Sequence, residues 1–284
     1  MKIVVTGASG RVAKAVIEDL QGDHELLLVS RRHPSEGPNG TRTNAPFVSA
    51  DLTTLDTCRR VVQGADAVAH IGAIGHPTDD TFRNNALSTY YMAEAMRQEG
   101  VKRMVFASSN CALGHCFRTS GHPFEAQFFP FTEQHPSVIE ENYGLSKKTN
   151  ELTLEAYTRS NGLYCYALRL GWCWDEQLMQ RRRTQPFDPA QHVGGFWCYV
   201  DMRDTAQAFR KALECPLPAE PHFGAYFISA ADTMAEEDSA ELVERFYPQY
   251  LHLAGNLHGR ESFFSNAAAG RDFGYAPQYS WRDA

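Results

Sequence analysis

The chain has 284 residues, 43% of them hydrophobic, which is enough for one large domain or one domain with a small appended lobe. Its 27 basic and 34 acidic residues give a net charge of −7 with no long basic run, so a nucleic-acid-binding surface is not indicated. No stretch approaches the roughly 18 apolar residues of a membrane-spanning helix, and no signal-peptide pattern opens the chain. We therefore expect a cytoplasmic protein that binds neither nucleic acid nor membrane.

In the first half, short apolar runs alternate with helical patterns. The pattern predicts strands at 2–5, 25–30, 47–48, 67–71 and 103–107, separated by helices at 11–21, 54–63 and 81–99. This alternation is typical of an α/β fold, here a Rossmann-type doubly wound parallel sheet. In such a sheet the crossovers are right-handed, and ligands bind beyond the carboxyl ends of the strands.

The second half is less regular. Residues 111–142 are rich in Phe, Pro, His and Gly and lack a period, as expected of a functional loop. Beyond them the sequence predicts a helix at 143–161, a strand at 163–170, a helix at 203–214 and a strand at 225–229. We expect residues 1–170 to form an NAD(P)-binding core. Residues 171–284 should form a substrate lobe, with some elements returning to the core.

Cysteine and histidine spacing gives no sign of a metal site. The seven cysteines are odd in number and contain no C-x-x-C, and the eleven histidines contain no H-x-x-x-H or H-E-x-x-H. We expect buried free thiols in a reducing compartment and no metal ion.

A glycine-rich turn, Thr6-Gly7-Ala8-Ser9-Gly10-Arg11-Val12-Ala13, lies between the first strand and the first helix. Gly7 permits the tight turn, Gly10 lets the backbone approach a pyrophosphate, and Ala13 allows close helix packing. The helix N-terminus adds free N–H groups and a positive dipole end. The predicted pyrophosphate contacts are Gly7, Ser9, Gly10, Arg11 and Val12.

The end of the second strand indicates the form of the nicotinamide cofactor. Proteins that prefer NAD usually carry an acid there, which binds the ribose 2′-hydroxyl. This chain has Val29-Ser30-Arg31-Arg32 instead, and an arginine fork can bind a 2′-phosphate. We therefore favour NADP over NAD, with Arg31 as the main contact and Arg32 in support. The alternative is two exposed arginines with no ligand.

Other residues at strand ends should complete the binding crevice. Asp51 and Leu52 follow the third strand, where Asp51 could bind the adenine amino group. Small residues at Ile71-Gly72-Ala73 would let the backbone pass close to the cofactor. Asn85, on the next helix, is either a buried polar anchor or an ordinary helix residue. Ile74 and Gly75 are candidate substrate contacts.

Tyr143 and Lys147 are four residues apart, so on a helix they share one face. A tyrosine is a poor base at neutral pH, but a nearby ammonium favours the phenolate, so Lys147 should lower the pKa of Tyr143. Lys147 could also hold the nicotinamide ribose. Ser109, at the end of the fifth strand, would orient the reacting oxygen toward Tyr143. Ser108 could simply cap backbone groups at the strand end.

Together these motifs resemble the extended short-chain dehydrogenases/reductases of the NAD(P)-dependent epimerase/dehydratase superfamily. The resemblance extends to Tyr199–Ala206 and to Phe273–Pro277, and so covers nearly the whole chain. It implies catalytic roles for Ser109, Tyr143 and Lys147. It also implies a homodimer, with helices 81–99 and 144–161 as the candidate interface.

Within this superfamily the chain is most similar to uronate dehydrogenases. Asn110 matches their substrate-binding Asn, and Arg181 lies near the place of the Arg that pairs with the sugar carboxylate. The chain departs from their pattern at three positions. Cys111 stands where those enzymes have His, Trp172 where they have Ser, and Arg31 where they have Asp. Trp172 and Trp174 would add an apolar or stacking wall to the substrate site.

The resemblance implies hydride transfer between the nicotinamide and a secondary alcohol or ketone, on a sugar or sugar-acid-like molecule. One alternative is a sugar-nucleotide epimerase with the same Ser-Tyr-Lys centre, although those enzymes usually have a larger C-terminal lobe. A 4,6-dehydratase is disfavoured, because Asn110-Cys111 stands where that branch has an Asp-Glu pair. The other alternative is a non-catalytic NADP sensor, although such sensors often lose the Tyr or Lys.

Overall fold

A seven-stranded parallel sheet forms the centre of the protein. The computed structural model describes residues 1–36 and 40–283. The strand order is β3-β2-β1-β4-β5-β6-β9, and every pairing is parallel. The strands span β1 Lys2–Thr6, β2 Glu25–Ser30, β3 Phe47–Ser49, β4 Ala67–His70, β5 Arg103–Ser109, β6 Tyr164–Leu170 and β9 Phe223–Ile228. The predicted Rossmann-type fold is confirmed.

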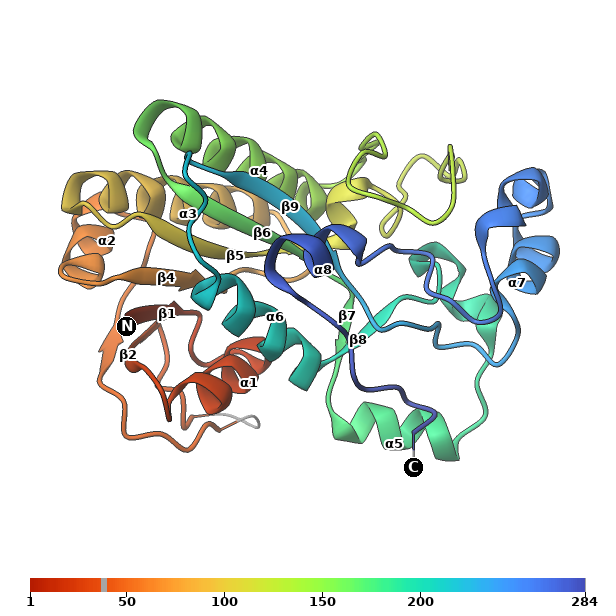
Figure 1. Ribbon diagram of the computed structural model, residues 1–284, viewed down its shortest axis with the longest axis horizontal. Coiled ribbons are helices and arrows are strands. Elements are labelled where there is room, and N and C mark those ends of the chain that lie inside the picture. The colour runs from red at the N-terminus through yellow and green to blue at the C-terminus, as the bar shows by residue number, and fades with distance from the viewer. Residues whose placement is uncertain (37–39, 284) are drawn as a thin grey trace.

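Helices cover both faces of the sheet (Figure 1). The helices α2 Leu55–Val62, α3 Thr81–Glu99 and α4 Asn142–Asn161 lie together on one face. The helices α1 Arg11–Leu20 and α6 Met202–Glu214 pack against each other on the opposite face. Because both faces are covered, β1, β4 and β5 are almost wholly buried and consist largely of apolar residues.

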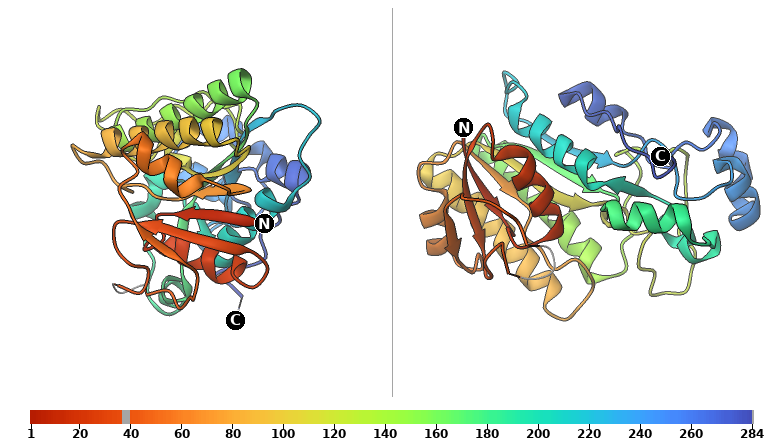
Figure 2. Two further views of the ribbon diagram at one scale, coloured as in Figure 1. Left: turned by 90° about the vertical axis from the view of Figure 1, so that its left-hand side faces the viewer. Right: turned by 90° about the horizontal axis from the view of Figure 1, so that it is seen from below.

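Helix α8 Ala267–Phe273 packs against β9 in the core that α1 and α6 share. The remaining elements gather beyond the carboxyl ends of the strands (Figure 2). They are β7 Trp172–Trp174, α5 Glu176–Thr184, β8 Tyr199–Asp201 and α7 Ser239–Phe246, with the 3-10 helices η1 Asn110–Leu113, η2 Pro189–Gly195 and η3 Pro248–Asn256. Strands β7 and β8 pair in a separate two-stranded sheet. A second hydrophobic core, rich in aromatic rings, joins this region to the 111–142 segment.

Most predicted elements agree with the structure to within two residues at each end. The 111–142 segment has only the short helix η1, and it is ordered by packing: Phe131 exchanges backbone hydrogen bonds with Phe263 and Ser265. The sequence analysis missed β7, β8, α5, α7 and α8, which are short elements of the second half. Strand β9 pairs with β6 in the main sheet, and α6 packs against α1. The division into two regions at residue 170 stays a prediction.

Candidate active site

A cavity of about 510 Å³ lies at the carboxyl ends of the central strands. All of the predicted cofactor residues line it: Gly7, Ser9, Gly10, Arg11, Val12, Arg31, Arg32, Asp51, Leu52, Ile71, Gly72, Ala73, Asn85, Tyr143 and Lys147. Ser109, Ile74 and Gly75 line it as well. The fold therefore brings the glycine-rich turn and the Ser-Tyr-Lys set into one site.

The glycine-rich turn is shaped by a close approach of two backbones. Gly7 has φ +67°, and a Cβ placed on it would lie 2.5 Å from Gly72 Cα. The hydroxyl of Thr6 holds the two segments together, accepting N–H bonds from Ile71 at 3.0 Å and from Gly72 at 3.1 Å. Only glycine fits at position 7 without displacing the segment after β4.

The N-terminus of α1 opens onto the same cavity. Gly10 is its N-cap residue, donates its own N–H to Gly7 O at 2.8 Å, and supplies no side chain to accept from the first-turn N–H groups. Such unpaired donors at a positive helix end suit a phosphate group. These residues therefore fit the pyrophosphate of a dinucleotide.

Two arginines lie at the far end of the cavity. Arg31 and Arg32 are exposed, and neither is paired with a carboxylate among the described residues. The neighbouring Asp51 accepts hydrogen bonds from the backbone and hydroxyl of Thr53. These bonds, and to a smaller extent the charge of Arg31, lower the pKa of Asp51. This corner thus offers two guanidinium groups and one carboxylate to a bound nucleotide.

Tyr143 is placed by the capping of its helix. The carboxylate of Glu141 accepts the N–H groups of Tyr143 at 2.5 Å and Gly144 at 2.6 Å, which fixes the start of α4. Position 144 must be glycine, because a Cβ there would lie 2.5 Å from Cys111 O. The first turn of α4 therefore packs directly against η1, and this contact brings Tyr143 beside Ser109.

Lys147 is buried and donates to Ala107 O on β5 at 2.7 Å. Burial lowers the pKa of Lys147 to about 8. Burial also raises the pKa of Tyr143, while contact with the Ser109 hydroxyl acts in the opposite sense. Lys147 Nζ lies 5.7 Å from the centre of the Tyr143 ring. The expected lowering of the Tyr143 pKa is therefore absent from this structure, because burial dominates.

A buried hydrogen-bond chain that no sequence pattern indicated links the glycine-rich turn to α4. His70 on β4 bonds Thr6 Oγ1 at 2.9 Å and Thr89 Oγ1 at 3.2 Å. Because Thr6 Oγ1 already accepts two N–H bonds, its own proton points to His70 Nδ1, leaving the imidazole proton on Nε2. Burial lowers the pKa of His70 to about 3, so the ring is neutral.

The chain continues through Asn85, which is a buried anchor. Thr89 Oγ1 donates to Asn85 O at 3.1 Å. The Asn85 side chain bonds both backbone groups of Ile74 and donates to Ser146 Oγ on α4 at 3.0 Å. The residue thus ties the cavity wall after β4 to the helix that carries Tyr143 and Lys147.

Ser108 has a partner of its own, so it does more than cap the strand. Its hydroxyl donates to Glu151 Oε1 at 2.7 Å, and Arg169 makes a two-pronged pair with the same carboxylate at 2.9 and 2.8 Å. This buried cluster fastens α4 to β5 and β6. The Ser108 hydroxyl is thereby occupied, and Ser109 stays the predicted catalytic serine.

The predicted substrate residues separate into three places. Ile74, Gly75 and Ser109 line the first cavity. Trp172, Trp174 and Arg181 line a second cavity of about 490 Å³. Asn110 and Cys111 are buried in η1 and line neither. Asn110 Oδ1 accepts from Ser109 Oγ at 3.4 Å and from the thiols of Cys111 and Cys116 at 3.7 and 3.8 Å.

All seven cysteines are free thiols. Within residues 1–36 and 40–283, no cluster of three His, Cys, Asp or Glu side chains could hold a metal ion. Over the same residues, no helix has the length and apolar character to cross a membrane.

The model of the NAD dependent epimerase/dehydratase family matches residues 3–172. The chain belongs to this family. It is an NAD(P)-dependent oxidoreductase of the extended short-chain dehydrogenase/reductase type.

Curated relatives cover most of the chain. It is 27% identical over 239 residues to L-arabinose 1-dehydrogenase (NAD(P)(+)) of Haloferax volcanii, covering 81% of this chain and 89% of the relative. It is 28% identical over 260 residues to uronate dehydrogenase of Pseudomonas putida, covering 77% of this chain and 90% of the relative. A solved short-chain dehydrogenase/reductase superfamily protein from Agrobacterium tumefaciens with bound NAD shares the fold, with a TM-score of 0.72 at 22% identity over 99% of this chain and 94% of that one.

Proposed function

We propose that the protein transfers a hydride between NADP and a secondary alcohol or ketone of a sugar or sugar-acid-like molecule. The single observation that carries this proposal is the convergence of Ser109, Tyr143 and Lys147 on the cavity that the glycine-rich turn also lines. The printed names of the curated relatives, arabinose and uronate dehydrogenases, support a sugar-like substrate.

Each of the three residues has a separate task in this proposal. Nicotinamide, when bound, supplies or accepts the hydride. Tyr143 exchanges a proton with the substrate oxygen, and Ser109 donates a hydrogen bond to that oxygen. Lys147 holds its charge close to the tyrosine ring and can turn from Ala107 O to a ribose hydroxyl. Ile74 and Gly75 line the same cavity. The Ser109 hydroxyl, which donates to Asn110 Oδ1 at 3.4 Å in this structure, would turn its one proton from Asn110 to the substrate oxygen.

Preference for NADP over NAD is part of the proposal. Arg31 and Arg32 are exposed at the edge of the cavity after β2, and neither forms an ion pair with a carboxylate among the described residues. A guanidinium binds a phosphate through two parallel hydrogen bonds. Asp51 stays available for the adenine amino group.

Reduction of NAD and of NADP, measured over a panel of aldoses, uronates, polyols and small ketones, tests the proposal. We expect turnover with at least one sugar-like compound and a higher kcat/KM with NADP. Sugar conversion without net cofactor reduction would indicate the epimerase alternative. Tight NADP binding with no turnover of the panel would indicate the sensor.

We further propose a homodimer built on α3 and α4. Tyr90, Leu145 and Leu152 are large apolar side chains on these neighbouring helices, and all three are exposed. A Leu152→Lys variant should lower the molar mass measured by light scattering from that of a dimer to that of a monomer. A reducing location such as the cytoplasm stays a prediction, which the free thiols support.

A further inference from the structure

The buried hydrogen-bond chain beside the first cavity reaches the backbone of Tyr143. Ser146 Oγ, which accepts from Asn85, donates its own proton to Tyr143 O at 2.7 Å. Ser146 and His70 are fully buried, and neither is among the described residues that line the first cavity. Both residues can therefore influence a bound molecule only through their neighbours. We call the connected residues the His70 chain: Thr6, His70, Thr89, Asn85, Ser146 and Tyr143.

The first half of the His70 chain has a fixed direction. Thr6 Oγ1 accepts two N–H groups of the segment after β4, so its own proton goes to His70 Nδ1. His70 Nε2 then donates to Thr89 Oγ1, and the Thr89 hydroxyl donates to Asn85 O. Each link points from the glycine-rich turn toward α3. Reversing the first link would give Thr6 Oγ1 a third donor.

The second half of the His70 chain keeps the same direction. Asn85 Oδ1 accepts from Ile74 N at 2.8 Å, which orients the amide so that Nδ2 donates to Ser146 Oγ at 3.0 Å. Ser146 then donates to Tyr143 O. Buried hydrogen bonds that point one way polarise one another, so each link is strengthened by its neighbours. The His70 chain thus connects the glycine-rich turn with the start of α4.

We infer that His70 and Ser146 are positioning residues that fix Tyr143 relative to the bound cofactor. The inference rests on the hydride-transfer function proposed above. In that function the glycine-rich turn holds the cofactor at one end of the His70 chain, and Tyr143 exchanges the proton at the other end. A break anywhere in the chain loosens both ends, so NADP binds less tightly and Tyr143 is held less well at the reacting oxygen.

Two single variants and their combination test this coupling. His70→Leu and Ser146→Ala break the chain at two places that share no side-chain hydrogen-bond partner among the described residues. Each should raise the Kd for NADP and lower kcat by about fivefold, as expected for the loss of a buried hydrogen bond. The double variant should show about the same fivefold change, and not the roughly 25-fold product, because a broken chain has no coupling left to lose.

Fluorescence titration measures the Kd for NADP, and initial rates measure kcat. Effects that multiply in the double variant, or a wild-type Kd for NADP in Ser146→Ala, would overturn the inference. Circular dichroism checks that each variant is folded. If His70→Leu does not fold, Thr89→Val breaks the chain at the next link and keeps the shape of the side chain.

Thr153 provides a matched control on the same helix. Its hydroxyl donates to Thr149 O at 2.9 Å, so Thr153→Ala also removes a hydrogen bond to the backbone of α4. Thr153 is not a member of the His70 chain. Thr153→Ala should therefore leave both kcat and the Kd for NADP near their wild-type values. A loss equal to that of Ser146→Ala would show that any weakening of α4 is enough, and would contradict the specific role of Ser146.

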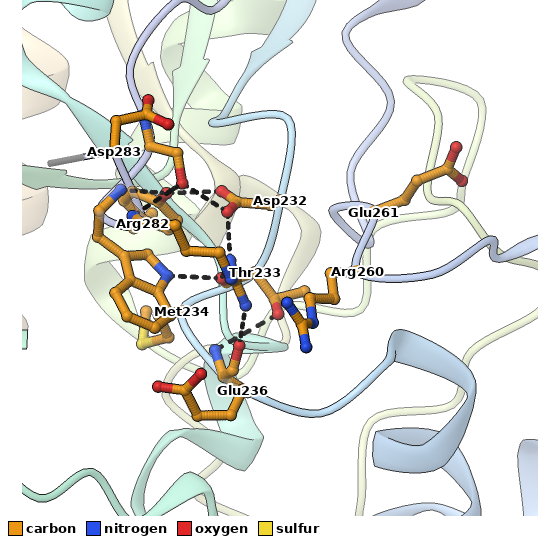
Figure 3. A network of polar contacts seen from close by, with 12 residues as sticks. Asp232, Thr233, Met234, Glu236, Arg260, Glu261, Arg282 and Asp283 are labelled. Atoms are coloured by element: carbon orange, nitrogen blue, oxygen red, sulfur yellow. Dashed lines mark hydrogen bonds and ion pairs between the residues drawn. The ribbon is translucent and has the colours of Figure 1, made fainter. Parts of the chain in front are cut away.

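The C-terminal polar network separates coupling from a general loss of stability. Asp232 accepts from Tyr199 at 2.6 Å and from Ser280 at 2.7 Å, and it pairs with Arg282 (Figure 3). Within the described residues, no hydrogen bond joins this network to the His70 chain. Asp232→Asn should therefore lower the melting temperature without raising the Kd for NADP. A rise equal to that of Ser146→Ala would overturn the inference.

The Kd measurements do not depend on turnover. If no compound on the panel is oxidised or reduced, the hydride-transfer function fails, and the Kd values of the single and double variants still test the His70 chain. Values that multiply would refute the coupling in that case. Values that match one another would support it as a link between the glycine-rich turn and α4.

Discussion

The two cavities beside β7 have similar volumes, about 510 and 490 Å³, and very different walls. The first is lined by glycines and strand ends together with charged and polar side chains such as Arg31, Tyr143 and Lys147. The second is built from tryptophan, histidine, phenylalanine and arginine side chains. Backbone groups recognise a phosphate whatever the neighbouring side chains are, whereas ring recognition needs particular side chains.

This difference separates the residues proposed for the chemical step from those proposed for choosing the substrate. In the proposed function the first cavity carries out the hydride and proton transfers, which follow the same steps on many substrates. The second cavity, lined by the predicted substrate residues Trp172, Trp174 and Arg181, would select the substrate. Changes in the first should therefore affect every substrate alike, and changes in the second should alter the ratio between substrates.

The largest effect is expected at Tyr143, in the first cavity. Tyr143→Phe removes the hydroxyl that exchanges the proton, so kcat should fall by about 10²–10⁴ for every substrate. The NADP dissociation constant, measured by fluorescence titration, should stay near the wild-type value. A variant that keeps more than half of the wild-type kcat would show that another group moves the proton.

The next largest effect is expected at the nucleotide end of the same cavity. Arg31→Asp replaces a cation with an anion, so kcat/KM with NADP should fall roughly 100-fold, which corresponds to about 2.7 kcal/mol. The value with NAD should rise, because a carboxylate binds the ribose hydroxyls. Arg32→Ala is the matched control and should change the ratio less. Initial rates with both cofactors measure these effects, and an unchanged ratio would contradict the role of Arg31.

The first cavity could be predicted from the sequence because its signals are local. The glycine-rich turn, the Tyr143–Lys147 spacing and Ser109 at a strand end each lie within a few residues, and parallel strands bring their carboxyl ends together. Their secondary structure followed from hydrophobic periodicity, which long buried elements show most clearly.

The second cavity could not be predicted in the same way. Strands β7 and β8 have three residues each, too few to show a period. Trp172 stacks on His192 and His192 on Phe187, while the Arg182 guanidinium lies against the rings of Phe187 and Trp281. No local pattern connects Trp281 with the other residues. The role of His70 was also hidden, because its partners Thr6 and Thr89 come from a different strand and a helix.

The buried His70, in the hydrogen-bond chain beside the first cavity, should make the free energy of unfolding depend on pH. Burial lowers the pKa of His70 to about 3 in the folded protein, and the pKa should return to the ordinary histidine value of about 6.5 on unfolding. Between these values the unfolded state binds a proton that the folded state rejects, so this histidine reduces stability as pH falls from 6.5 toward 3. The slope from one such group approaches about 1.4 kcal/mol per pH unit.

Urea unfolding between pH 4 and 7 measures this dependence. His70→Gln removes the titrating ring, so its free energy of unfolding should vary less steeply with pH than that of the wild-type protein. His115, whose pKa burial lowers to about 4, is present in both proteins and cancels in the comparison. Identical slopes would show that His70 is protonated in the folded state.

The smallest effect is expected in the second cavity, at Arg181. Arg182 pairs with Glu236 and Arg183 pairs with Glu176, but Arg181 has no carboxylate partner within the described residues and bonds only the side chain of Gln185. It is exposed, and exposed ion pairs contribute up to about 1 kcal/mol. Arg181→Gln should therefore raise KM for an acidic sugar by at most about fivefold. Because only the charge is lost, KM for the neutral sugar of the same skeleton should change less.

Arg245→Gln, at an exposed arginine that pairs with Glu237 outside both cavities, is the matched control. Equal rises in KM for acidic and neutral sugars would mean that Arg181 shapes the cavity wall and does not recognise charge.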